Sequence, residues 1–153
     1  MNIKEKIFSA LKESYPTLKQ LKDDFYIIGT SALILSGIEI ENTSDIDILV
    51  SERDAVWLRK EWENKSINFI PSNSFLFRSN YSRYEFPDID IEIIGSLKVN
   101  KEGIWKPLVI KDFIIFETDE FQVKIPTIEE QVRILILFGR KKDLDRLDLI
   151  HNN

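Results

Sequence analysis

Residues 25–50, FYIIGTSALILSGIEIENTSDIDILV, decide the fold of this chain. The apolar run 25–28 predicts a short buried strand that ends at Gly29. The segment 31–36 is rich in Ala, Leu and Ile and predicts a short helix that stops at Gly37. Aspartate and apolar residues alternate over 45–50, which predicts a second strand. This stretch therefore predicts a strand, a tight turn, a helix and another strand.

The carboxylates of the second strand are the first candidate functional residues. Asp45 and Asp47 are two positions apart, so on a strand both side chains point to one face. The later segment 88–93 repeats the pattern as Asp-Ile-Asp-Ile-Glu-Ile. If the two strands are neighbours, carboxylates of both face one cleft. Clustered carboxylates repel one another unless a cation lies between them, and oxygen ligands suit Mg²⁺. Such alternation is also typical of a strand with one face in water.

The turn at Gly29 has a composition that suits an anion. Glycine lets the backbone approach a ligand closely, and the N–H groups at the start of a helix attract phosphate. Thr30 and Ser31 add two hydroxyl groups. The same three residues also form an ordinary helix N-cap. The turn is therefore a candidate phosphate site that needs support from the carboxylates.

The remainder of the chain predicts an α+β fold, with a mixed β-sheet flanked by helices. Residues 1–22 form an expected N-terminal helical segment, which Pro16 is expected to interrupt. A capping box, Thr127-Ile-Glu-Glu130, opens the C-terminal helices expected over 127–150. At this length we expect a single domain across residues 1–153.

Composition limits the chemistry that the chain can carry. The net charge of −5 argues against nucleic-acid binding by bulk electrostatics, but bound Mg²⁺ would still allow a nucleotide substrate. There is no cysteine, which excludes disulfides and thiolate metal sites, and the one histidine, His151, lies near the end of the chain. Carboxylates must therefore carry any acid–base or metal chemistry. No apolar run approaches the roughly 20 residues that span a bilayer, so we expect a cytoplasmic protein without a membrane partner.

Taken together, these residues resemble the DNA polymerase β-like nucleotidyltransferase superfamily. The resemblance rests on Gly29-Thr30 after an apolar strand, on Asp45-Ile-Asp47 and on a later strand carboxylate, Glu92 or Asp90. The chain is similar to small bacterial single-domain members of this group, among them the nucleotidyltransferase toxins of abortive-infection systems. The segments 126–130 and 139–144 resemble the tail of the same members. Thr30 stands where the family usually has glycine or serine.

The resemblance implies a magnesium-dependent enzyme that moves NMP from an NTP, such as ATP, to a hydroxyl acceptor by a two-metal carboxylate mechanism. The acceptor would be a tRNA or other RNA end, a protein side chain or a small molecule, and a partner protein is expected if the chain belongs to a toxin–antitoxin pair. Two Mg²⁺ ions are implied, with Mn²⁺ as the alternative ion. The implied catalytic and metal-binding residues are Asp45, Asp47 and Glu92 or Asp90, and the implied nucleotide-binding residues are Gly29, Thr30, Ser31 and Lys142.

Two other functions fit the same residues. A catalytically inactive module of this fold would bind a nucleotide or a partner protein, and a two-metal nuclease would use the carboxylates on water. Among the basic residues, Lys141 and Lys142 are favoured for the triphosphate, whereas Arg78 and Arg83 are expected to be solvated surface charges. Trp105 is the tryptophan best placed by the sequence to stack on a base.

Overall fold

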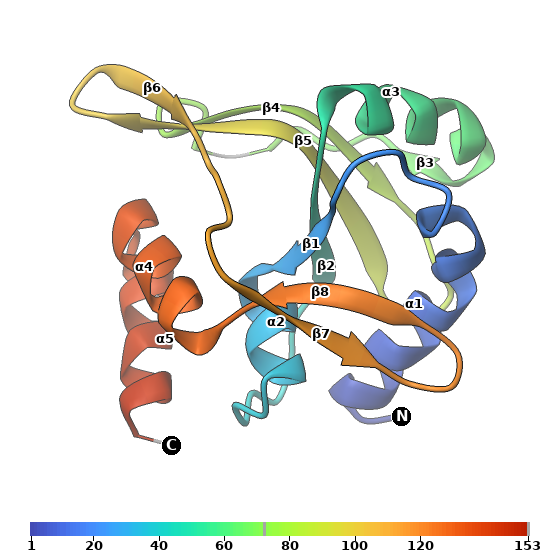
Figure 1. The fold of residues 1–153 in the computed structure, drawn as a ribbon, viewed down its shortest axis with the longest axis horizontal. Coiled ribbons are helices and arrows are strands. Elements are labelled where there is room, and N and C mark those ends of the chain that lie inside the picture. The colour runs from blue at the N-terminus through green and yellow to red at the C-terminus, as the bar shows by residue number, and fades with distance from the viewer. Residues whose placement is uncertain (72, 153) are drawn as a thin grey trace.

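A mixed β-sheet forms the centre of the computed structural model, which describes residues 1–71 and 73–152. The strands of this eight-stranded sheet lie in the order β3-β4-β5-β2-β1-β8-β7, and β6 pairs with β5 (Figure 1). The strands are β1 (Tyr26–Ile28), β2 (Asp45–Val50), β3 (Ser66–Ile67), β4 (Phe77–Tyr84), β5 (Asp90–Lys101), β6 (Ile104–Pro107), β7 (Phe113–Glu117) and β8 (Gln122–Pro126). The helices are α1 (Ile3–Leu18), α2 (Gly29–Leu35), α3 (Glu52–Glu61), α4 (Ile128–Phe138) and α5 (Lys141–His151). The predicted α+β fold is confirmed.

The helices cover the two faces of the sheet. Ile46 and Ile48 of β2 are fully buried and belong to one core with residues of α1, α2 and α3. Because side chains alternate along a strand, Asp45 and Asp47 lie on the opposite face. The helices α4 and α5 stand on the far side of the molecule from α1 (Figure 1), and their residues line the same cavity as these two aspartates. Among the described residues, no helix is long and apolar enough to cross a membrane.

Local signals set both ends of α4, and the start predicted at Thr127 is confirmed. The Thr127 side chain accepts a hydrogen bond from the backbone N–H of Glu130 at 3.2 Å, and Gly139 ends the helix with a φ of 63°. At the N-terminus the expected interruption at Pro16 is wrong, because α1 continues through it and ends at Leu18. Pro16 lies in the last turn of α1, so the backbone hydrogen bond that its missing N–H would have made to the preceding turn is lost near the end of the helix, where only Thr17 and Leu18 follow it.

The register of the central strands brings the carboxylates of the two Asp-Ile segments and the Gly29 turn to one place in the fold. The strands β2 and β5 are parallel, with Asp45 opposite Asp90 and Asp47 opposite Glu92. The strand β1 runs antiparallel to β2, with Ile28 opposite Asp47. The chain therefore leaves β1 at Gly29 directly beside the Asp47 carboxylate.

Candidate functional site

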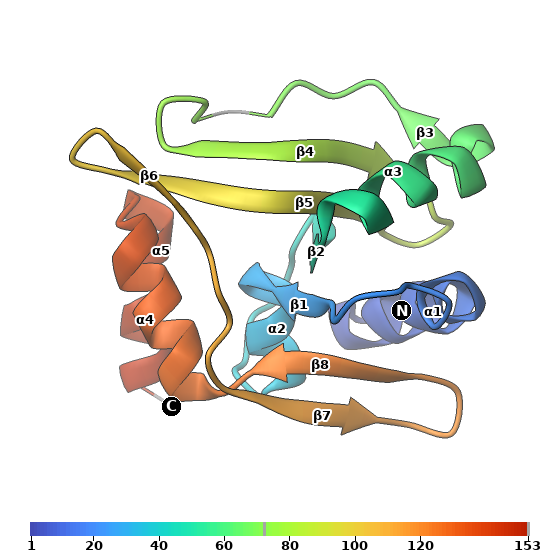
Figure 2. The same cartoon turned by 45° about the horizontal axis from the view of Figure 1, so that its top comes forward.

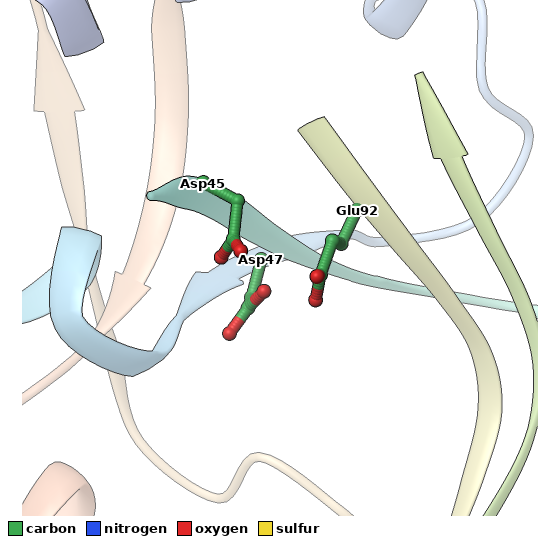
Figure 3. A group of neighbouring side chains, drawn as sticks. All are labelled: Asp45, Asp47 and Glu92. Atoms are coloured by element: carbon green, nitrogen blue, oxygen red, sulfur yellow. The ribbon is translucent and has the colours of Figure 1, made fainter. Parts of the chain in front are cut away.

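Three carboxylates from two strands converge on one side of the sheet. Asp45 and Asp47 come from β2, and Glu92 comes from the neighbouring position on β5. One oxygen atom of each residue can be chosen such that the three atoms lie within 4.8 Å of one another. Figure 3 shows the three side chains directed to the same side of the strands. This cluster is the centre of the candidate site.

Asp47 is the least satisfied member of the cluster. Its Oδ1 atom is buried and has no hydrogen-bond partner among the described residues. Burial raises the pKa of Asp47 well above its usual range, and the neighbouring carboxylates of Glu92 and Asp45 raise it further. A buried acceptor without a partner is costly, and a cation held between the carboxylates relieves that cost. The all-oxygen donor set fits a hard divalent ion such as Mg²⁺ or Mn²⁺.

Asp90 is set apart from this cluster, although it lies on the same face. Its Oδ2 atom accepts hydrogen bonds from Arg83 Nε at 3.2 Å and Arg83 Nη2 at 3.1 Å. The cluster of three carboxylates consists of Asp45, Asp47 and Glu92, and Asp90 is not a member of it. In the parallel register Glu92 lies opposite Asp47. Asp90 lies two positions earlier on β5, opposite Asp45, and its carboxylate is paired with Arg83.

Arg83 is a buried member of the site, and its expected place among the solvated surface charges is wrong. Its side chain is only 12% exposed, and its Nη1 atom lies 3.2 Å from Asp45 Oδ2 and 2.6 Å from Glu92 Oε1. Burial opposes the charge of the guanidinium, but Asp90 and the two other carboxylates outweigh it and raise the pKa of Arg83. Sequence reasoning missed Arg83 because the β4–β5 register, which places it opposite Glu92, is not a local signal.

Gly29 is required by the close approach of the turn to Asp47. Its φ is +71°, a conformation that residues with a Cβ rarely adopt, and a Cβ built there would lie 2.8 Å from Asp47 Oδ2. Thr30 lines the cavity beside it. The Ser31 hydroxyl instead donates to the backbone carbonyl of Asp45 at 3.0 Å and is buried. Ser31 therefore ties α2 to β2 rather than facing the cavity.

The carboxylates form one wall of a cavity of about 730 Å³ between the sheet and helices α4 and α5. Ligand pockets for small molecules commonly measure about 300–1,000 Å³, so a nucleotide-sized ligand is within range. The basic residues that line it are Arg78, Arg83, Arg140, Lys142 and Arg146, and its apolar lining includes Phe77, Ile94, Leu97, Ile134, Leu135 and Phe138. The cavity thus combines acidic, basic and apolar walls.

The basic wall includes two residues one helical turn apart on α5, Lys142 and Arg146. The Arg146 Nε atom donates a long hydrogen bond of 3.4 Å to Thr30 Oγ1, across 116 residues of sequence. This contact brings α5 to the turn that follows β1. Lys142 was expected here and lines the cavity, whereas Arg146 was missed. The spacing of four residues, which puts both side chains on one helix face, is the signal that could have found Arg146.

The aromatic residues of the cavity differ from the expected one. Phe77 and Phe138 pack edge to face with ring centroids 4.7 Å apart, and the Arg140 guanidinium lies 4.9 Å from the Phe77 ring. Trp105 lines a separate, smaller pocket and is covered by the Arg78 guanidinium at 3.9 Å. The structure therefore places Phe77 and Phe138, rather than Trp105, where a flat apolar group could pack inside the cavity.

Comparison with known proteins supports the fold and leaves the activity open. No family model matches the chain. No curated protein matches it in sequence. A crystal structure of a candidate nucleotidyltransferase from Thermotoga maritima is similar, with a TM-score of 0.78 and 22% identity over 98% of this chain and 95% of that chain. An antigenic nucleotidyltransferase-like protein from Paracoccidioides brasiliensis is similar with a TM-score of 0.55 and 14% identity, over 98% of this chain and 76% of that chain. The chain thus shares its fold with proteins described as nucleotidyltransferases or as similar to them.

Proposed function

We propose that the chain is a nucleotidyltransferase that moves NMP from an NTP to a hydroxyl acceptor. The observation that carries the proposal is the convergence of Asp45, Asp47 and Glu92 beside the Gly29 turn, in a cavity whose opposite wall is basic. In the reaction, the acceptor oxygen forms a bond to the α-phosphorus and loses its proton. The bond from that phosphorus to its bridging oxygen breaks, and pyrophosphate leaves.

The three clustered carboxylates would hold the metal, and the fold suggests two Mg²⁺ ions with Mn²⁺ as the alternative. Bound divalent ions would neutralise phosphate charge and lower the pKa of the acceptor hydroxyl. Asp47 would be a metal ligand through its buried Oδ1 atom, which has no hydrogen-bond partner in the described part of the chain. We retain Glu92 as the third ligand and assign Asp90 to the positioning of Arg83.

The rest of the cavity provides groups for the other parts of an NTP. The backbone at Gly29 and the Thr30 hydroxyl would face the phosphates, because glycine has no side chain and both residues line the cavity. Lys142 and Arg146 would pair with the terminal phosphates, since both line the cavity from α5. The base would pack against the apolar lining of the cavity around Phe77 and Phe138. The acceptor would be an RNA end, including tRNA, a protein side chain or a small molecule.

Arg83 gives the site a fixed internal charge. Its contacts with Asp45 and Glu92 hold two of the three carboxylates in place and offset part of their mutual repulsion. A metal bound by the same oxygens would have to compete with these contacts. This observation favours a second candidate function, a nucleotide-binding module of the same fold that does not turn over.

A labelled-nucleotide assay separates the two functions. Each α-labelled NTP is incubated with Mg²⁺ and with RNA, protein or small hydroxyl compounds, and released pyrophosphate and transferred label are measured. Transfer should occur with the natural chain, disappear in Asp47→Asn and persist in Asp88→Asn, a control at an exposed carboxylate that accepts a hydrogen bond from Ser9. Metal-dependent NTP binding without release would favour the binding module. NTP binding without release that is also unchanged in Asp47→Asn would favour the binding module further, and an absence of NTP binding would contradict both functions.

A further inference from the structure

The strand β7 forms an edge of the sheet and carries three consecutive exposed apolar residues. Phe113, Ile114 and Ile115 are 39%, 48% and 53% exposed. Among the strands of the described residues, β7 pairs only with β8, and Figure 2 shows it at the outer margin of the sheet, with no other drawn element beyond it. An apolar edge strand is a template for pairing with another strand, and natural proteins usually blunt such edges with charges, prolines or a covering segment.

The hydrogen bonds to β8 determine which backbone groups of β7 face outward. The Asp112 carbonyl accepts from Thr127 N at 3.2 Å, and Thr118 N donates to the Phe121 carbonyl at 2.9 Å. In an antiparallel pair the residues bonded to one neighbour alternate with residues directed to the other side. The groups directed away from β8 are therefore those of Phe113, Ile115 and Glu117. Within the described residues, β8 is the one strand paired with β7, and no backbone hydrogen bond outside the helices and the sheet uses these groups.

We propose that β7 pairs antiparallel with β7 of a second copy of this chain, about a two-fold axis at Ile114. This register places Ile114 opposite the partner's Ile114, and Phe113 opposite the partner's Ile115. Each Phe113–Ile115 pair exchanges two backbone hydrogen bonds, because both residues direct their groups outward. The pairing needs no change in the β7–β8 ladder.

Charge complementarity selects a second copy as the occupant and this register as the pairing. Lys111 and Glu117 stand three residues on either side of Ile114. Lys111 precedes the first residue of β7 by two positions, and its backbone N–H donates to Glu130. With the chain extended to Lys111, the two-fold axis brings the Lys111 side chain opposite the partner's Glu117 at both ends. A register centred on Ile115 forms no such charge pair within β7 and places Phe113 opposite the partner's Glu117. The register at Ile114 leaves one comparable mismatch, Asp112 opposite the partner's Phe116. Apolar and opposite-charge cross-strand pairs stabilise antiparallel strands, and like charges destabilise them.

The expected dimer is weak and depends on concentration. One pair of short strands buries less surface than the roughly 800 Å² per partner of a standard stable interface. The interface is isologous, because the same strand meets itself. None of the residues that it uses lines the cavity of the candidate site. The dimer therefore does not depend on the proposed function.

Single cysteines test the register directly, because the natural chain has none. The two Ile114 residues would form a non-hydrogen-bonded pair with Cα atoms about 4.5 Å apart, a separation that a disulfide can span. Ile114→Cys should form a disulfide-linked dimer on mild oxidation. Ile136→Cys is the matched control, since Ile136 is 58% exposed on α4, and it should stay monomeric. Thermal melts of the reduced variants establish that both fold.

Sedimentation velocity over a range of concentrations tests the charge pairs. Lys111→Glu should weaken the dimer by about tenfold, because both ends become like-charged. The exchange Lys111→Glu with Glu117→Lys should restore it. A natural chain that is monomeric at all concentrations, with Ile114→Cys no better cross-linked than Ile136→Cys, would overturn the proposal. Preferential cross-linking through Ile115→Cys, or a dimer indifferent to Lys111→Glu, would overturn the register.

Discussion

Replacing Asp47 by asparagine should stabilise the metal-free protein while it destroys the candidate site. In its ionised form the Asp47 carboxylate lies beside those of Asp45 and Glu92, and its buried Oδ1 atom has no hydrogen-bond partner in the described part of the chain. Two charges about 4–5 Å apart at an effective dielectric constant of about 20 repel by roughly 3–4 kcal/mol. Arg83 offsets much of this repulsion through its contacts with the other two carboxylates. We therefore expect Asp47→Asn to gain about 1–2 kcal/mol, or roughly 2–8 °C in Tm for a domain of this size.

The assay is thermal unfolding at pH 7.5, first in chelator and then with Mn²⁺. The natural chain should be stabilised by Mn²⁺, by about 2.7 kcal/mol when the ion is at 100 times its Kd. Asp47→Asn should melt higher than the natural chain in chelator and should gain nothing from Mn²⁺. Asp90→Asn is the matched control and should keep the Mn²⁺ gain, because Asp90 is outside the group of three. If Asp47→Asn has a lower Tm than the natural chain in chelator, the Asp47 carboxylate does not destabilise the metal-free protein. If Mn²⁺ still stabilises Asp47→Asn, Asp47 is not a metal ligand.

Three further predictions concern the same site. Gly29→Ala should lose metal-dependent NTP binding in a calorimetric titration, and its free energy of unfolding should fall by about 2 kcal/mol. The new Cβ would lie 2.8 Å from Asp47 Oδ2, on a backbone with a strained φ. Unchanged NTP binding would contradict this prediction. Arg83→Gln should lower the free energy of unfolding by about 3 kcal/mol in chelator, since it leaves largely buried carboxylates without the guanidinium that pairs with them. It should also show a larger Mn²⁺-induced rise in Tm than the natural chain. A smaller rise would contradict the competition between Arg83 and the metal. Folding raises the pKa of Asp47 above 3.8, so protonated Asp47 contributes stability below pH 3.8, and this contribution is lost as the pH rises through the raised pKa. In a series of thermal melts in chelator, Asp47→Asn should not show this loss of stability. Identical pH profiles for the two proteins would contradict the prediction.

The elements that depend on local sequence could be predicted. Alternation along 45–50 placed Asp45 and Asp47 on one face and the isoleucines in the core, as the structure shows. The strand, turn and helix around Gly29 also form, because glycine at the turn has a positive φ. Such signals reside in a few consecutive residues, where side-chain alternation and turn chemistry decide the structure.

Pairings between distant segments could not be predicted from the sequence. Glu92 and Asp90 are in phase on one strand, and only the register of β5 against β2 puts Glu92 opposite Asp47. Arg83 becomes a partner of the carboxylates only because β4 adds to the other side of β5. The contact of Arg146 with Thr30 joins two segments that are 116 residues apart in the sequence. Each of these depends on tertiary packing, which local propensity does not encode.

The most direct test of the account is a crystal structure of the protein with Mn²⁺ and a non-hydrolysable NTP analogue. Anomalous scattering would locate the metal without reference to the proposed chemistry. We predict a Mn²⁺ peak bound by Asp45, Asp47 and Glu92, with the triphosphate along Gly29 and Thr30 and the base toward Phe138. Mn²⁺ bound elsewhere, or an ordered triphosphate with no metal at Asp47, would show that the three carboxylates do not form a metal site for an NTP.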